Sequence, residues 1–128
     1  MTPPFRVEVV KSIHSRIIIA TGGSPGVRDH GLLAASLSSP FQTFGGKDLH
    51  PGIVEKAAAL ASGIIRNHPF VDGNKRTAYV LMRILLLDHR MRLTANEDER
   101  ENALVALAEG SWTPDQFTEW LKGKVSTT

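Results

Sequence analysis

Residues 53–89 read IVEKAAALASGIIRNHPFVDGNKRTAYVLMRILLLDH and decide the fold. From Ile53 to Asn67 the chain is rich in alanine and apolar every three or four residues, which predicts a helix that a neighbour can approach closely. From Asn74 to about His89 the same spacing returns, with inward-facing Ala78, Leu81, Met82, Leu85 and Leu86. Further apolar residues widen this second face, and a helix that is apolar on most sides lies at the centre of its fold. The stretch therefore predicts two central helices joined by a short loop.

Two weaker helical patterns precede the central pair. Apolar spacing predicts a helix over about residues 6–20, although alternation over residues 5–9 leaves a short strand as the alternative. Gly22-Gly23 ends that helix, because glycine adopts the backbone conformation that terminates helices. Asp29 is placed to cap a second, short helix.

The remaining segments carry turn and capping signals. Residues 39–50 contain two phenylalanines, the polar residues Gln42 and Thr43 and the adjacent pair Gly45-Gly46, which together favour a β-hairpin or an extended loop. Asn96, with a glutamate three residues later, predicts a capping box that opens a helix ending at Gly110. Thr113-Pro114 predicts the start of a last helix. The fold class is therefore all-α, a compact bundle of about six helices with one small hairpin.

The composition limits the function classes. The 128 residues predict a single domain, and 41% hydrophobic with 22% charged residues is typical of a globular chain. The chain has no cysteine, which excludes a disulfide scaffold, a thiolate zinc site and a cysteine nucleophile. A net charge of +2 is weak support for nucleic-acid binding. With no signal peptide and no long apolar run, we expect a cytoplasmic protein that contacts neither membrane nor nucleic acid directly.

The polar chemistry is concentrated in the loop HPFVDGNKR, residues 68–76, between the two central helices. Pro69 disfavours helical geometry at the residue before it, and Asp72-Gly73-Asn74 is a turn sequence that leads into the next helix. Phe70 and Val71 are expected to anchor the loop in the core. An ordinary turn with a helix cap is the structural alternative. The joint occurrence of these residue types between the two most buried helices favours a functional site.

Each polar residue of the loop suits one part of phosphate chemistry. The unpaired N–H groups that follow Gly73 form a site for an anion. Lys75 and Arg76 are electrostatically unfavourable at a helix N-terminus, so their presence favours a bound polyanion such as phosphate. Asp72 offers a hard oxygen ligand for Mg²⁺ bridging to phosphate. His68 is suited to act as a general base.

The loop resembles the signature of the Fic/Doc superfamily, H-x-F-x-(D/E)-(G/A)-N-(G/K)-R. The residues that match it are His68, Phe70, Asp72, Gly73, Asn74, Lys75 and Arg76. Further segments look like the death-on-curing (Doc) branch and extend the resemblance over nearly the whole chain, namely residues 22–29, 31–33, 40–46, 108–110 and 120–121.

The resemblance implies a role for each matching residue. His68 would take the proton from a target hydroxyl, and Asp72 would hold Mg²⁺. ATP phosphates would be held by the backbone at Gly73 and Asn74, the Asn74 side chain, Lys75 and Arg76. Residues 40–49 match the family's flap, a hairpin that aligns a target segment by adding it as a strand, here through Phe41, Gln42, Thr43 and Phe44. A plain surface hairpin is the alternative.

Two departures from the AMP-transferring pattern bear on the reaction. That pattern commonly has glycine where this chain has Lys75, and a second arginine where this chain has Tyr79. Lysine is the choice of the Doc branch, whose members transfer the γ-phosphate of ATP to a threonine of elongation factor Tu. Gly73, where Doc has alanine, makes the motif intermediate. We expect γ-phosphoryl transfer to a protein Ser or Thr, with AMP transfer and a non-catalytic nucleotide- or partner-binding module as alternatives.

The chain lacks the inhibitory pattern of many Fic enzymes, (S/T)-x-x-x-E. None of the seven glutamates has Ser or Thr four residues before it. The resemblance therefore implies a toxin of a type II toxin–antitoxin pair, inhibited by a small antitoxin in trans.

Overall fold

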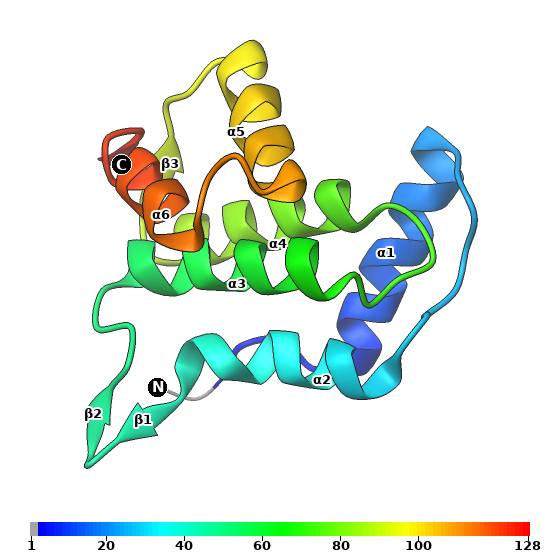
Figure 1. Ribbon diagram of the computed structural model, residues 1–128, viewed down its shortest axis with the longest axis horizontal. Helices are drawn as coiled ribbons and strands as arrows, with labels where there is room; N and C mark the ends of the chain where they lie inside the picture. The colour runs from blue at the N-terminus through cyan, green and yellow to red at the C-terminus, as the bar shows by residue number, and fades with distance from the viewer. Residues whose placement is uncertain (1–2) are drawn as a thin grey trace.

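The structure, a computed structural model, describes residues 3–128 and is dominated by helices (Figure 1). In chain order they are α1 (Val7–Thr21), α2 (His30–Ser38), α3 (Ile53–Asn67), α4 (Asn74–Asp88), α5 (Glu97–Glu109) and α6 (Pro114–Lys122). A short 3₁₀ turn, η1 (Ser39–Phe41), follows α2. The expected mostly-α architecture with about six helices is confirmed.

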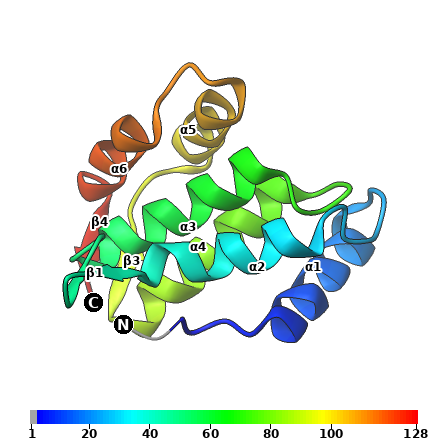
Figure 2. The same ribbon diagram turned by 60° about the horizontal axis from the view of Figure 1, so that its bottom comes forward.

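The antiparallel pair α3 and α4 forms the centre of the molecule (Figures 1 and 2). The five α4 residues predicted to face inward are each at most 1% exposed, and the α3 alanines Ala57, Ala58 and Ala61 are fully buried. Small side chains on α3 allow α4 to approach closely. Two helices that lie this close can be joined by the short loop between them. Helices α2 and α6 pack on α3, while α1 contacts α4.

The predicted caps are formed. The Asp29 side chain accepts a hydrogen bond from the Leu32 N–H at 2.9 Å. Asn96 and Glu99 form a reciprocal capping box at the start of α5, and Gly110 ends that helix with φ of 80°. Thr113 and Gln116 form a second box at α6. These local interactions satisfy N–H groups that a helix cannot pair internally.

The hairpin predicted around Gly45-Gly46 consists of β1 (Thr43–Phe44) and β2 (Lys47–Asp48), which pair antiparallel. A second antiparallel pair, β3 (Met91–Leu93) with β4 (Val125–Thr127), was not predicted. Its strands have three residues each, too short to show a period-two pattern, and they pair over a long sequence separation. The expectation of a single hairpin is therefore corrected.

A buried lysine fixes the base of the hairpin to α3. Lys56, only 2% exposed, donates to the Asp48 carboxylate at 2.9 Å and to the carbonyl oxygens of His50 and Pro51. Hydrogen bonding to Lys56 lowers the pKa of Asp48 below its ordinary value.

Throughout residues 3–128, none of the helices has the length and apolar character needed to cross a bilayer.

Candidate active site

The loop between α3 and α4 brings the matching motif residues to one end of the central helix pair. Pro69 follows His68, and α3 ends at Asn67, as predicted. His68 has φ of 52°, a left-handed conformation uncommon outside glycine, and its side chain is exposed. Such backbone positions concentrate at functional sites because the surrounding structure must hold them in place.

Arg28 and its neighbours hold this end of α3 in place. The Arg28 guanidinium donates to the carbonyl oxygens of His68 at 2.6 Å and Asn67 at 2.7 Å. The backbone N–H groups of Arg28 and Asp29 both donate to the Pro69 carbonyl. A cation at a helix C-terminus is favourable because the helix dipole is negative there. The loop that precedes α2 therefore fixes the backbone that carries His68.

The Asn74 side chain connects the two ends of the loop between α3 and α4. It is 5% exposed; its Oδ1 accepts from the Phe70 N–H and its Nδ2 donates to the Phe70 carbonyl, each at 3.0 Å. The Phe70 ring is fully buried, as predicted. Val71 is 49% exposed, so its predicted role as a core anchor is wrong. These two bonds use one acceptor position and one N–H of the Asn74 amide, and the backbone N–H of Asn74 lies in the first turn of α4.

The N-terminus of α4 is a candidate anion site. Gly73, with φ of 77°, is the N-cap residue and supplies no side-chain cap. The first-turn N–H groups of a helix have no internal partners, and the helix dipole adds positive potential there. Gly73, Asn74, Lys75 and Arg76 all line the same cavity. This arrangement suits phosphate oxygens.

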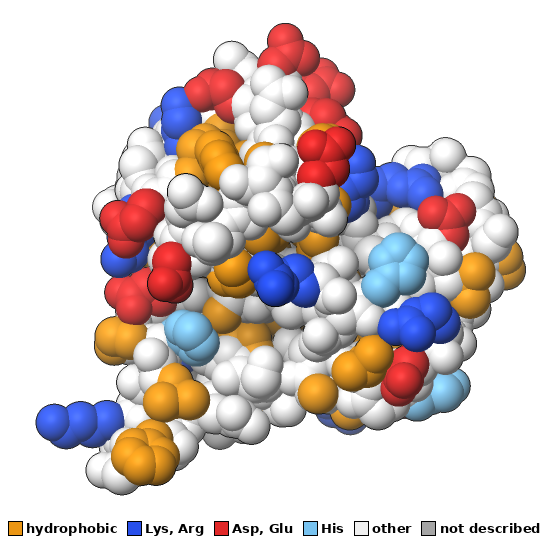
Figure 3. Space-filling model, viewed as in Figure 1, with side chains coloured by type: hydrophobic (Ala, Val, Ile, Leu, Met, Phe, Trp, Pro, Cys, Tyr) orange, Lys and Arg blue, Asp and Glu red, His pale blue; other side chains and the backbone are white. Residues whose placement is uncertain are grey.

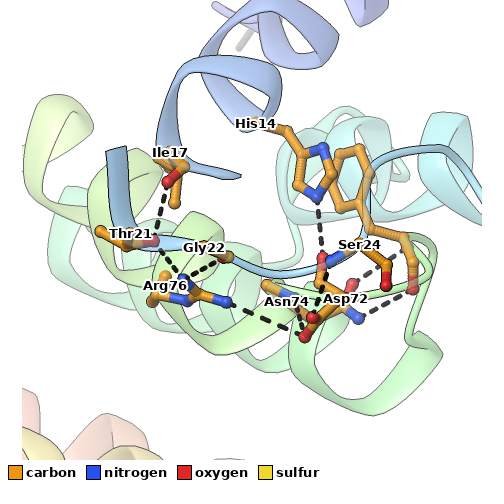
Figure 4. Close-up of polar contacts among 10 residues, drawn as sticks. His14, Ile17, Thr21, Gly22, Ser24, Asp72, Asn74 and Arg76 are labelled. Carbon is orange, nitrogen blue, oxygen red and sulfur yellow. Dashed lines mark hydrogen bonds and ion pairs between the residues drawn. The ribbon is translucent and has the colours of Figure 1, made fainter. Parts of the chain in front are cut away.

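Asp72 is held in position by two backbone N–H groups. Its Oδ2 accepts from Ser24 at 3.0 Å and its Oδ1 accepts from Gly73 at 2.8 Å (Figure 4). These bonds, with a smaller contribution from the Arg76 charge, lower the pKa of Asp72 below its ordinary value. The carboxylate is therefore ionised at neutral pH.

A magnesium ion fits this donor set on chemical grounds. The Asp72 side chain is 47% exposed and faces the cavity, and Mg²⁺ is often bound by one or two carboxylates together with substrate phosphates. Within residues 3–128 no group of three or more metal-ligating side chains forms a self-sufficient protein site. Any Mg²⁺ here would take its remaining ligands from phosphate and water.

Arg76 has a structural contact that the sequence did not reveal. Its Nη1 donates to Thr21 Oγ1 and to the Gly22 carbonyl, the latter at 2.9 Å, while Nη2 lies 3.8 Å from the Asp72 carboxylate (Figure 4). Arg76 therefore lies at the negative C-terminal end of α1. This contact is one structural reason for an arginine at the start of α4. The Arg76 side chain also lines the cavity, where its charge is available to an anion.

His14 is a site residue that sequence reasoning missed. Its side chain is 3% exposed, stacks on Phe70 with ring centroids 3.8 Å apart, and Nε2 lies 2.7 Å from the Asp72 carbonyl oxygen. Because a carbonyl can only accept, Nε2 carries the proton. His14 on α1 thus supports the backbone of the loop from behind. Helical spacing could have placed it on the inner face of α1, but not opposite Asp72.

The glycine-rich segment after α1 packs directly on Asp72. A Cβ atom at Gly23 would lie 2.5 Å from Asp72 Oδ2 and 3.2 Å from Arg76 Nη2, and φ there is 116°. The sequence pattern predicts only that Gly22-Gly23 ends the helix. Gly23 is required because the backbone must approach the carboxylate closely enough for the neighbouring N–H to bond it.

Gly23→Ala tests this close approach. We expect a loss of about 1–3 kcal/mol in the free energy of unfolding, from the disfavoured φ and the clash, together with weaker nucleotide binding. Ser24→Ala is the matched control, because it keeps the N–H that bonds Asp72. Thermal unfolding and calorimetric titration with MgATP measure both effects. Equal behaviour of the two variants would show that the segment does not position Asp72.

The cavity has a volume of about 790 Å³ and lies between the loop and α5. Its remaining walls are formed by Ile65, Tyr79, Glu97, Asp98, Arg100, Glu101, Leu104 and Ala108. Lys75 reaches across it to Glu101 at 3.2 Å. Figure 3 shows acidic side chains gathered over α5 beside basic ones that lie toward α1. A cavity of this size accommodates a nucleotide-sized ligand.

The structure does not bring the predicted flap to this cavity. The hairpin lies at the N-terminal end of α3 and His68 at its C-terminal end (Figures 1 and 2). A 15-residue helix spans about 22 Å at 1.5 Å per residue. Phe41, predicted as a docking residue, is 3% exposed and belongs to the core. The exposed part of the predicted docking segment is Gln42, Thr43 and Phe44.

Comparison with known proteins agrees with the motif. Residues 4–86 match the family model for the Fic/DOC family. Over 80 residues the chain is 45% identical to "Toxin Doc" of Mycolicibacterium smegmatis (strain ATCC 700084 / mc(2)155), and the match covers 62% of this chain and 62% of that protein. The family match includes the loop with His68, Asp72 and Arg76. This chain belongs to the Fic/DOC family.

Proposed function

We propose that this protein is the toxin of a type II toxin–antitoxin pair and that it transfers the γ-phosphate of ATP to a Ser or Thr hydroxyl of a target protein. The relative named Toxin Doc supports the toxin role. The observation that carries the chemistry is that His68, Asp72 and the N-terminus of α4 line one cavity of about 790 Å³. Elongation factor Tu, the target implied by the family resemblance, is the first candidate target.

In the proposed reaction each residue has one task. His68 accepts the proton of the target hydroxyl, whose oxygen bonds to the γ-phosphorus as the bond to the β–γ bridging oxygen breaks and ADP leaves. Asp72 holds Mg²⁺, which supplies charge neutralisation for the phosphates when bound. The first-turn N–H groups of α4, with Lys75 and Arg76, hold phosphate oxygens. Catalysis of this kind depends mainly on positioning and charge stabilisation.

Target docking at Gln42, Thr43 and Phe44 is part of the proposal and defines the geometry that a target must have. An extended target segment of about seven residues spans about 23 Å at 3.3 Å per residue, which is close to the length of α3. A target that adds a strand to the hairpin can therefore reach His68 with a hydroxyl residue farther along the same segment. The Lys56 contact keeps the hairpin base fixed for this purpose.

The proposed reaction is tested by incubating the full chain with MgATP and purified elongation factor Tu and measuring the intact mass of the factor. We expect a gain equal to one phosphoryl group. A gain equal to AMP would replace the kinase proposal by adenylyl transfer, and an unchanged mass would remove elongation factor Tu as the target. Expression in cells with and without a candidate antitoxin tests the toxin role separately, through growth arrest and its relief.

A further inference from the structure

Arg100 on α5 is a cation of the cavity to which the motif assigns no role. It lines the same cavity as His68 and Asp72. Its guanidinium carbon lies 5.3 Å from the centre of the Tyr79 ring, which belongs to α4. The Tyr79 hydroxyl also accepts a hydrogen bond from Arg83 at 3.2 Å, and this bond is exposed to solvent. Arg100 is half-buried and is held in place by an aromatic face.

The guanidinium of Arg100 has unused hydrogen-bonding capacity. Across residues 3–128 it forms no ion pair and donates no side-chain hydrogen bond, although acidic residues lie next to it on α5. The other two cations of the cavity are engaged, Lys75 with Glu101 and Arg76 with Asp72. A guanidinium presents five N–H donors in a planar fork that matches the oxygens of a phosphate. Arg100 is therefore a donor without an acceptor, placed in the cavity.

The position of Arg100 follows from the geometry of α4. Arg76 and Tyr79 are three residues apart on one helix, so their side chains share a face and are offset by about 4.5 Å along the axis. Because Arg100 lies over Tyr79, it is about one helical turn beyond the anion site at the start of α4. A ligand with phosphates in series can contact both places, whereas a monophosphate cannot.

We propose that Arg100 binds the polyphosphate chain of the nucleotide, at a phosphate other than the one held by the N-terminus of α4. This inference rests on the proposed function, since it names a further residue for the same donor. Glu97 and Asp98 line the same wall of the cavity. Without Arg100 that wall carries negative charge facing the phosphates, which increases the expected effect of its removal.

Calorimetric titrations of the full chain with ATP, ADP and AMP, each in the presence of Mg²⁺, test the inference. For Arg100→Ala we expect ATP and ADP to bind about 10–100-fold more weakly, because charge-assisted hydrogen bonds are lost, while AMP affinity changes less than about threefold. Arg100→Lys, which keeps the charge but lacks the fork, is expected to fall between the wild type and Arg100→Ala. If Arg100→Ala does not fold, the comparison of Arg100→Lys with wild type carries the same test.

Arg83→Ala is the matched control, because Arg83 also contacts Tyr79 but does not line the cavity. It removes the same charge from the protein and is expected to leave ATP affinity within about threefold of wild type. ATP affinity unchanged in Arg100→Ala, or equal losses for ATP and AMP, would overturn the inference. Wild-type protein that binds no ATP would instead overturn the proposed function, so the two failures are distinguishable.

Discussion

His68→Ala is expected to lower phosphate transfer to the target by about 10²–10⁴-fold, the usual contribution of a general base. The side chain is exposed and lies outside the core, so its removal creates no cavity in the packed interior. Initial rates of phosphate incorporation into elongation factor Tu from MgATP measure the effect. In cells, the same variant is expected to abolish growth arrest.

The left-handed backbone at His68 requires a second variant. Alanine at φ of 52° adds backbone strain that histidine and asparagine tolerate better. His68→Asn therefore removes the base while keeping the local conformation, and it is expected to be as inactive as His68→Ala. His89→Ala, at the far end of α4, is the control for loss of a histidine and is expected to retain activity. Full activity in His68→Asn would exclude His68 as the base.

The parts of the fold that could be predicted are those specified by short-range interactions. The capping boxes at Asn96 and Thr113 involve residues three apart, and both formed. The apolar spacing of α3 and α4 identified the central pair. The pairing of β3 with β4 could not be predicted, because it joins segments more than thirty residues apart and neither has a pattern of its own.

The same distinction explains the candidate site. The motif loop is contiguous, so its residues could be named from the sequence. Its supports come from far away along the chain: the Ser24 N–H bonds Asp72 across 48 positions, and the His14 ring meets the Asp72 carbonyl across 58. No local signal predicts such pairs. Val71 and Phe41 were misplaced for a related reason, since apolar character alone does not say which of two neighbouring side chains turns inward.

The Asp72 carboxylate leads to the second large expected effect. Asp72→Asn is expected to lower transfer by about 10²–10³-fold, because it removes the charge that holds Mg²⁺. Asparagine also has one acceptor oxygen where the carboxylate has two, so its NH₂ group would face one of the two backbone donors, Ser24 or Gly73. The variant therefore loses the metal ligand and one of the bonds that orient it.

A titration with Mg²⁺ at fixed ATP separates this role from a merely structural one. Wild-type transfer is expected to rise with Mg²⁺ and Asp72→Asn transfer to stay low and flat. Asp98→Asn makes the same charge change in the same cavity and is expected to keep the magnesium response. The hydrogen bonds from Ser24 and Gly73 lower the pKa of Asp72 below the ordinary aspartate value of 3.8, so its carboxylate is ionised near neutral pH and loses its charge only as the pH falls toward and below that value. A normal magnesium response in Asp72→Asn would show that the metal is held elsewhere.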